Sequence, residues 1–311
     1  MRVRKYTSLG GAVGDKSAEG SSFQLKEINM LAASTQGVRP VVMTTPGQPT
    51  SDGAGVKLTR MIGTQSLHTL DPFLMLDFFA TDKAQDYIAG FPEHPHRGFD
   101  TVTYMLAGRM RHRDNHGHEG VIEAGGVQWM TAGRGIVHSE MPEQREGLMK
   151  GFQLWVNLPA RLKMTPPAYA EFDASEIPSE QRGGASLRVI AGTTSSGMVG
   201  PVQAAHVDAR YFDVTLPAGE TLKEPLPDGH NAILVVFEGA IAVAGQDVRA
   251  RSLAVLGREG SVEVSAGAEG ARFLLISGRP IGEPVAWGGP FVMNTEAEVR
   301  QAFADYRSGR F

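Results

Sequence analysis

The apolar segments of this chain are short, and turn-forming residues bound most of them. Extended, partly alternating runs occupy residues 56–62, 72–76, 101–105, 127–130 and 152–158, with glycine, proline or aspartate nearby. Glycine accounts for 38 of the 311 residues, well above the ordinary share of about 7%. Short strands at close intervals, separated by turn signals, are typical of a β-sandwich or β-barrel. The chain is therefore predicted to be all-β, with one exception at its end.

The exception is a helix predicted over residues 296–307. Asn294 or Thr295 can cap its start, and acidic residues fall in its first turn. Val299, Phe303 and Tyr306 follow at helical spacing. We expect a short C-terminal helix with one apolar side.

The chain length predicts about two domains of ~150 residues each. Prolines and glycines concentrate between residues 159 and 184, and strand-like segments resume after them. The first 52 residues are rich in glycine, serine, threonine and proline, which is typical of loops. We predict a flexible leader at 1–52, an N-terminal domain at 53–165, a linker at 166–186 and a C-terminal domain at 187–311.

The two predicted domains share a weak internal repeat. Residues 105–110 (Met-Leu-Ala-Gly-Arg-Met) resemble residues 236–241 (Val-Phe-Glu-Gly-Ala-Ile). Residues 127–129 then align with residues 253–255 if the intervening loop of the second copy is five residues shorter. This repeat favours two copies of one β-barrel.

Composition excludes several classes of function. The 30 basic and 34 acidic residues give a net charge of −4, too small to attract nucleic acid or an anionic membrane. The chain has no cysteine, which excludes disulfides, iron–sulfur clusters, thiolate zinc sites and cysteine nucleophiles. No run approaches the ~18 apolar residues of a membrane span, and the N-terminus lacks the apolar core of a secretory signal. We expect a cytoplasmic protein that binds neither membrane nor nucleic acid.

Two short pairs of residues have the spacing of metal ligands. His94 and His96 are two residues apart, as are His138 and Glu140, so each pair points to one face of an extended strand. A single such histidine pair most often means two surface side chains. If the two segments are neighbouring strands, three imidazoles and one carboxylate converge, a set that suits Fe(II), Mn, Ni, Cu or Zn.

Other charged features have plainer explanations. His112, His116 and His118 form a histidine-rich tract that could be a second metal site, but a solvated hairpin loop is the favoured interpretation. Arginines alternate at 109, 111 and 113 on one face of a predicted strand. Such a face is usually solvated, although it could also bind an anion or an acidic partner.

Longer stretches of the sequence resemble the pirin branch of the cupins. The general cupin pattern is met by the three histidines, although Asp100 stands where that motif has glutamate. The segments that resemble pirins are residues 94–104, 127–142, 153–158 and 289–294, and residues 70–77 fit as well. The resemblance extends from about residue 55 to the C-terminus.

Because pirins are bicupins, the resemblance implies two tandem cupin (jelly-roll β-barrel) domains. It also implies that only the N-terminal barrel binds metal, with the ligands His94, His96, His138 and Glu140. One divalent cation is expected, with Fe(II) preferred over Ni, Cu, Mn, Co or Zn. The C-terminal barrel has only two histidines, His206 and His230, and neither has a second histidine or a glutamate two residues away. Asp208 follows His206 at that spacing but has no partner pair. The C-terminal barrel is therefore expected to be metal-free.

The resemblance further implies an activity, because bacterial pirin-like proteins resemble quercetin 2,3-dioxygenases. In that reaction a metal-held flavonol combines with O2 and carbon monoxide is released, and Glu140 is expected to act as the general base. The alternative is an iron-dependent redox-sensing regulator that binds a transcription factor or a metabolic enzyme without catalysis. We expect a monomer whose ligands are a flavonol-like small molecule and O2 or, in the alternative, a regulatory protein partner.

Overall fold

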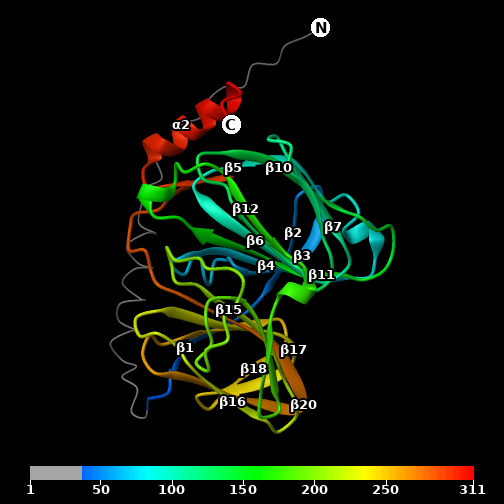
Figure 1. Cartoon of the computed structure of the whole chain (residues 1–311), viewed down its shortest axis with the longest axis vertical. Coiled ribbons are helices and arrows are strands. Elements are labelled where there is room, and N and C mark those ends of the chain that lie inside the picture. Colours follow the sequence, from blue (N-terminus) through cyan, green and yellow to red (C-terminus); the bar gives the residue numbers. More distant parts are fainter. Residues whose placement is uncertain (1–36) are drawn as a thin grey trace. The chain divides into compact units, whose positions relative to one another are not determined.

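A computed structural model describes residues 37–311 and contains two β-barrels followed by one α-helix (Figure 1). The first barrel has a seven-stranded and a four-stranded sheet. The larger sheet has the order β12 (Ala168–Phe172), β9 (Val127–Thr131), β6 (Phe99–Ala107), β11 (Met149–Asn157), β4 (Phe73–Thr81), β3 (Val56–Ile62) and β2 (Gln48–Asp52). The smaller sheet has the order β5 (Phe91–His96), β10 (Ile136–Pro142), β7 (Met110–Asp114) and β8 (Glu119–Ile122).

The second barrel is built on one nine-stranded sheet. Its main order is β1 (Val41–Pro46), β19 (Ser252–Leu256), β17 (Asn231–Val243), β20 (Ser261–Gly278), β15 (Arg210–Leu216), β14 (Ala185–Ala191) and β13 (Ser179–Arg182). Two further strands pair with the long strands β20 and β17, namely β16 (Thr221–Pro225) and β18 (Gln246–Arg249). Three short 3-10 helices, η1 (Ala84–Asp86), η2 (Ala160–Leu162) and η3 (Ala174–Glu176), lie between strands. No helix within residues 37–311 has the length and apolar character needed to span a membrane.

The alternation of side chains along the strands gives each sheet face a distinct role. In β6, Val102 and Tyr104 belong to an apolar cluster that also contains Ile233 and Val235 of the second barrel. The intervening residue Thr103 points the opposite way, into the first barrel. Tyr104 also donates a hydrogen bond from its hydroxyl to Asp213 (2.7 Å). The outer face of the seven-stranded sheet is therefore the contact with the second barrel, and the inner face is free to form a site.

The C-terminal segment returns to the first barrel. It contains β21 (Ala286–Gly288), β22 (Phe291–Met293) and α2 (Glu296–Arg307), the helix that the sequence predicts. Arg97 directly follows the histidine strand β5, and its Nη1 lies 2.8 Å from Asp305 of α2. The ring of Phe311 stacks on the same guanidinium at 4.3 Å. The end of the chain thus holds the residue next to a predicted metal ligand.

Two predicted boundaries differ from the structure. Part of the expected leader forms strands: β1 pairs with β19 of the second barrel, and β2 pairs with β3 of the first. The remainder, residues 1–36, lies outside the described residues. The expected linker contains β12, which pairs with β9, and β13, which pairs with β14. Both sequence windows are rich in turn-forming residues, and Gly47 and Gly183 do lie between strands, whereas Pro46 and Pro49 lie within β1 and β2.

The internal repeat is present in the structure. Gly108 follows β6 and Gly239 lies within β17, and both have positive φ angles (85° and 67°) that favour glycine. Strand β9 pairs with β6 as β19 pairs with β17. The two barrels therefore use the same strand–turn arrangement, as the repeat predicts.

The contact of Arg97 with α2 gives a prediction for stability. Arg97→Met should lower the free energy of unfolding by about 2–3 kcal/mol, because its side chain is 4% exposed and its charged hydrogen bonds are lost. Arg310 binds the same carboxylate from a 58% exposed position, so Arg310→Met should cost less than about 1 kcal/mol. Urea unfolding of the two variants measures the difference; equal losses would contradict it.

Candidate metal centre

The two histidine-containing segments lie on neighbouring antiparallel strands. His138 of β10 is directly opposite His94 of β5, and Ile136 is opposite His96. The ring centroids of His94, His96 and His138 are 4.4–5.0 Å apart. One nitrogen from each ring lies within 4.8 Å of the other two. The predicted convergence of three imidazoles is therefore confirmed, and their spacing could hold one metal ion.

The three imidazoles are suited to metal binding in their chemical state. Burial, followed by the neighbouring histidines, lowers the pKa of His96 and of His138 well below 6.5, so both rings are neutral. His94 donates from Nδ1 to the carbonyl oxygen of Pro92 (2.8 Å), which leaves its Nε2 free to accept. Neither ring nitrogen of His138 has a hydrogen-bond partner, although both are buried. Neutral, unpartnered nitrogens are the form that metals require.

Glu140 lies in the same cavity but outside the group of three histidines. A bulge separates Glu140 from His138 in the pairing of β10 with β5. Its carboxylate accepts hydrogen bonds from Thr103 Oγ1 (3.1 Å) and Gln153 Nε2 (3.3 Å). The two donors hold the carboxylate on the inner face of the seven-stranded sheet. Its role as a fourth ligand or as a base remains a prediction.

A row of polar residues crosses the inner face of the seven-stranded sheet. Each member is directly opposite the next in the strand register, in the order Arg60, Asp77, Gln153, Thr103, Gln128 and Glu171. Arg60 forms a two-pronged ion pair with Asp77 (both distances 2.8 Å). The sequence analysis missed this row. A signal for it is a polar residue with apolar neighbours on both sides within a strand, as at Asp77 of β4 and Gln153 of β11.

His94, His96 and Glu140 line a cavity of about 590 Å³. Its walls are largely apolar and include Phe79, Met110 and Trp155. The C-terminal segment supplies one wall, with Trp287, Gly289 and Pro290. Cavities of ~300–1,000 Å³ with a few polar groups are typical of small-molecule sites. Sequence reasoning assigned residues 187–311 to a separate domain, so it missed this contribution.

The second barrel has different residues at the corresponding positions. Strand β16 precedes the long strand β17 and pairs with the first half of β20, as β5 precedes β6 and pairs with β10. In the first barrel, β5 and β10 carry His94, His96, His138 and Glu140. The inward-facing residues of the matching strands in the second barrel are Leu222, Glu224, Val262 and Val264. These apolar side chains belong to the interior cluster of the second barrel, apart from Glu224.

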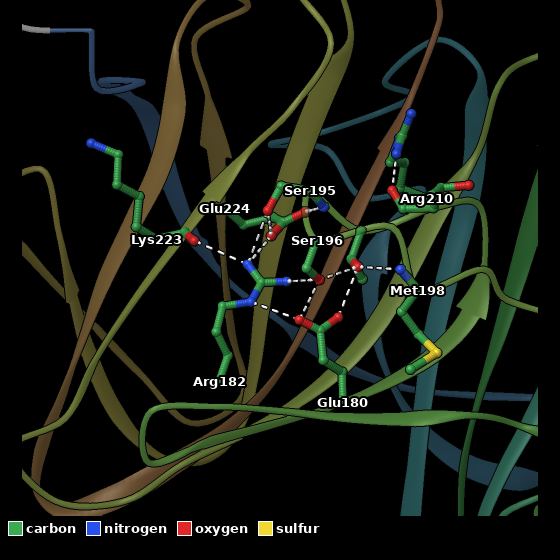
Figure 2. A network of polar contacts seen from close by, with 10 residues as sticks. Glu180, Arg182, Ser195, Ser196, Met198, Arg210, Lys223 and Glu224 are labelled. Carbon is green, nitrogen blue, oxygen red and sulfur yellow. Dashed lines mark hydrogen bonds and ion pairs between the residues drawn. The ribbon is translucent and has the colours of Figure 1, made fainter.

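Glu224 is already fully engaged (Figure 2). It pairs with Arg182 and accepts hydrogen bonds from the backbone nitrogen and the hydroxyl of Ser195, both at 2.8 Å. Arg182 also binds Glu180 at 2.9 Å. His206 and His230 lie elsewhere, 3.4 Å from Asp100 and Asp208 respectively. That the second barrel is metal-free stays a prediction.

Asp100 does not take the ligand role that the general cupin motif gives to this position. Its carboxylate accepts a hydrogen bond from Trp129 Nε1 (2.8 Å), and burial raises its pKa to about 7. It lies three residues before Thr103 on β6 and therefore on the opposite face of the sheet. Asp100 thus belongs to the contact between the barrels and not to the metal centre.

The arginine face is solvated, as expected, whereas the histidine tract is partly buried. Arg109, Arg111 and Arg113 are exposed and pair with glutamates, as expected of a solvated face. The interpretation of the histidine tract as a solvated loop is wrong for His112, which is fully buried on β7. His112 is directly opposite Glu140 in the register, so it faces the barrel interior, whereas His116 is exposed.

Comparisons with known proteins agree with this architecture. The family profile described as Pirin matches residues 55–156, and that of the Pirin C-terminal cupin domain matches residues 211–311. A pirin-like protein of Caulobacter vibrioides is 60% identical over 275 residues, covering 88% of this chain and 99% of that protein. A Pseudomonas aeruginosa protein, provisionally named a quercetin 2,3-dioxygenase, is 50% identical and covers 87% of this chain and 97% of its own. A solved quercetin 2,3-dioxygenase from Acinetobacter baumannii has a TM-score of 0.81 at 34% identity, covering 88% and 98% of the two chains.

The lowered pKa values of His96 and His138 predict a loss of stability in acid for the metal-free protein. Below about pH 6.5 the unfolded chain takes up protons on these histidines while the folded chain does not. The free energy of unfolding should therefore fall as the pH drops from 7.5 to 5.5. The double variant His96→Asn/His138→Asn should show a shallower fall in melting temperature over this range. Identical slopes for the two proteins would show that these histidines are not held neutral.

Proposed function

This chain belongs to the pirin family, and we propose that it is a metal-dependent dioxygenase acting on a flavonol or a similar chelating substrate. The observation that carries the proposal is the convergence of three imidazoles, two of which, His94 and His96, line a largely apolar cavity of about 590 Å³. The relatives that carry the name quercetin 2,3-dioxygenase support it.

In this proposal His94, His96 and His138 hold one divalent cation. Fe(II) is the proposed metal, with Ni, Cu, Mn, Co and Zn as alternatives, since the donor set contains no sulfur. When bound, the cation supplies open coordination positions for a chelating substrate and for O2. The histidines keep their geometry because the two strands that carry them are hydrogen-bonded neighbours.

Glu140 is the proposed general base. A flavonol must lose the proton of its 3-hydroxyl to chelate a cation, and the carboxylate of Glu140 faces the cavity where that proton is released. Thr103 and Gln153 hold this carboxylate through hydrogen bonds at 3.1 and 3.3 Å. Their proposed role is to position the base, since both donate hydrogen bonds to it.

The cavity walls have two further tasks in the proposed reaction. Trp155 and Trp287 lie on adjoining walls, with ring centroids 5.9 Å apart, and offer flat apolar surfaces to a polycyclic substrate. Together with Phe79 and Met110 they exclude water from the bound flavonol. O2 then adds across the central ring, the ring opens, and one carbon leaves as carbon monoxide.

The proposal predicts quercetin cleavage by the protein loaded anaerobically with Fe(II). Addition of O2 should decrease quercetin absorbance and release carbon monoxide in equal amount. Glu140→Gln should keep the metal, which three imidazoles still hold, but should lower kcat by roughly 10²-fold or more because the base is lost. Glu123→Gln is the control, since Glu123 is 63% exposed on the outer surface.

Two outcomes would contradict this function. Full turnover by Glu140→Gln would remove the base assignment, while leaving the metal centre intact. Absence of carbon monoxide with a fully metal-loaded wild-type protein would remove the dioxygenase proposal for quercetin-like substrates.

A further inference from the structure

A second group of ligating side chains lies at the far end of the polar row. His112 comes from β7, His118 from the turn before β8, and Glu171 from the edge strand β12. One ligating atom from each lies within 4.8 Å of the other two. Glu171 Oε1 is 2.6 Å from His112 Nε2 and 3.8 Å from His118 Nε2. We propose that these three residues form a second divalent-cation site, separate from the proposed catalytic centre.

A simple hydrogen bond does not account for the environment of His112. Its side chain is 1% exposed, and neither ring nitrogen has a hydrogen bond of acceptable geometry. The carboxylate oxygen Oε1 of Glu171 lies 2.6 Å from Nε2, and no polar group of the described residues partners Nδ1. Buried nitrogens are costly to leave unpaired. A cation coordinated by both atoms would satisfy the imidazole and the carboxylate together.

Neighbouring residues hold the ligands in place. The Tyr169 ring stacks on His118, with centroids 4.1 Å apart and an interplanar angle of 28°, and on His112 at 5.7 Å and 28°. Gln128 Nε2 donates to Glu171 Oε1 at 2.6 Å. Carboxylate ligands of metals are commonly oriented by such a hydrogen bond. Both supporting residues belong to the seven-stranded sheet, Tyr169 on β12 and Gln128 on β9.

Gly120 on β8 leaves the space that a cation would need. A Cβ atom at this position would lie 2.5 Å from His112 Nε2 and 3.0 Å from Glu171 Oε2. The backbone of Gly120 has no positive φ angle, so the conformational freedom of glycine is not what this position uses. The requirement is steric: any other residue would place a carbon atom against two of the three ligands.

The site is reachable and chemically selective. The side chains of His118 and Glu171 are each 35% exposed, so a cation can enter from solvent while His112 lies beneath them. Two imidazoles and one carboxylate favour zinc, nickel, cobalt or copper over calcium or magnesium. Because His112 belongs to the four-stranded sheet, His118 to the turn between its strands β7 and β8, and Glu171 to the seven-stranded sheet, a bound cation would link the two sheets. Binding should therefore stabilise the fold.

Zinc binding to the untagged, chelator-treated full chain tests the proposal. Equilibrium dialysis with metal analysis should give two zinc ions per wild-type chain and one for His118→Asn. His116→Asn is the matched control, because His116 lies in the same turn but is exposed and outside the group; it should bind two. Glu171→Gln, which preserves shape and size, is a second variant and should bind one.

Variants of the first centre distinguish the two sites. His96→Ala should still bind one zinc and still gain melting temperature from it, and His96→Ala/His118→Asn should do neither. If His118→Asn and Glu171→Gln each still bind two zinc ions, the second site is overturned. It is also overturned if His96→Ala binds no zinc while its circular dichroism spectrum stays native. Loss of metal from the first centre alone does not change the zinc bound at the second site. The experiment can therefore contradict either proposal without contradicting the other.

Discussion

The antiparallel pairing of β5 with β10 is the constraint on which the site depends. It places His138 directly opposite His94, and the two-residue spacing then brings His96 to the same face. Neither strand could hold three imidazoles alone. The C-terminal segment secures this pair of strands from outside, through the contact of Arg97 with Asp305 and through the cavity wall that begins at Trp287. The C-terminal end of the second domain's sequence thus serves a centre located in the first.

The two barrels share one framework but have interiors of opposite character. In the second, apolar residues such as Phe212, Leu234 and Phe273 fill the space between the strands. In the first, a register-matched row of polar residues crosses the inner face from Arg60 to Glu171 and leaves a cavity. A filled apolar interior stabilises the fold, whereas buried polar groups are costly unless they are paired. The second barrel therefore provides packing that lets the first accommodate a site.

Much of the architecture follows from the sequence. The short strands, the repeat at Gly108 and Gly239, the helix after Thr295 and the three histidines all rest on local spacing, which sequence displays directly. Strand β1 and the edge strand β12 were missed because their pairing partners are distant in the chain. Glu171 was missed for the same reason: it meets His112 only when the barrel closes. Strand β2 pairs with the next strand, β3, and was missed because its sequence, Gln-Pro-Thr-Ser-Asp, has the composition of a loop.

The central claim is that one metal ion sits among His94, His96 and His138, and its most direct test is a crystal structure of the zinc-loaded protein. Diffraction data collected on both sides of the zinc absorption edge locate the metal without reference to the protein atoms. The account predicts an anomalous peak bonded to the three imidazoles at about 2.0–2.1 Å. A fully loaded crystal with no peak between these rings would contradict it.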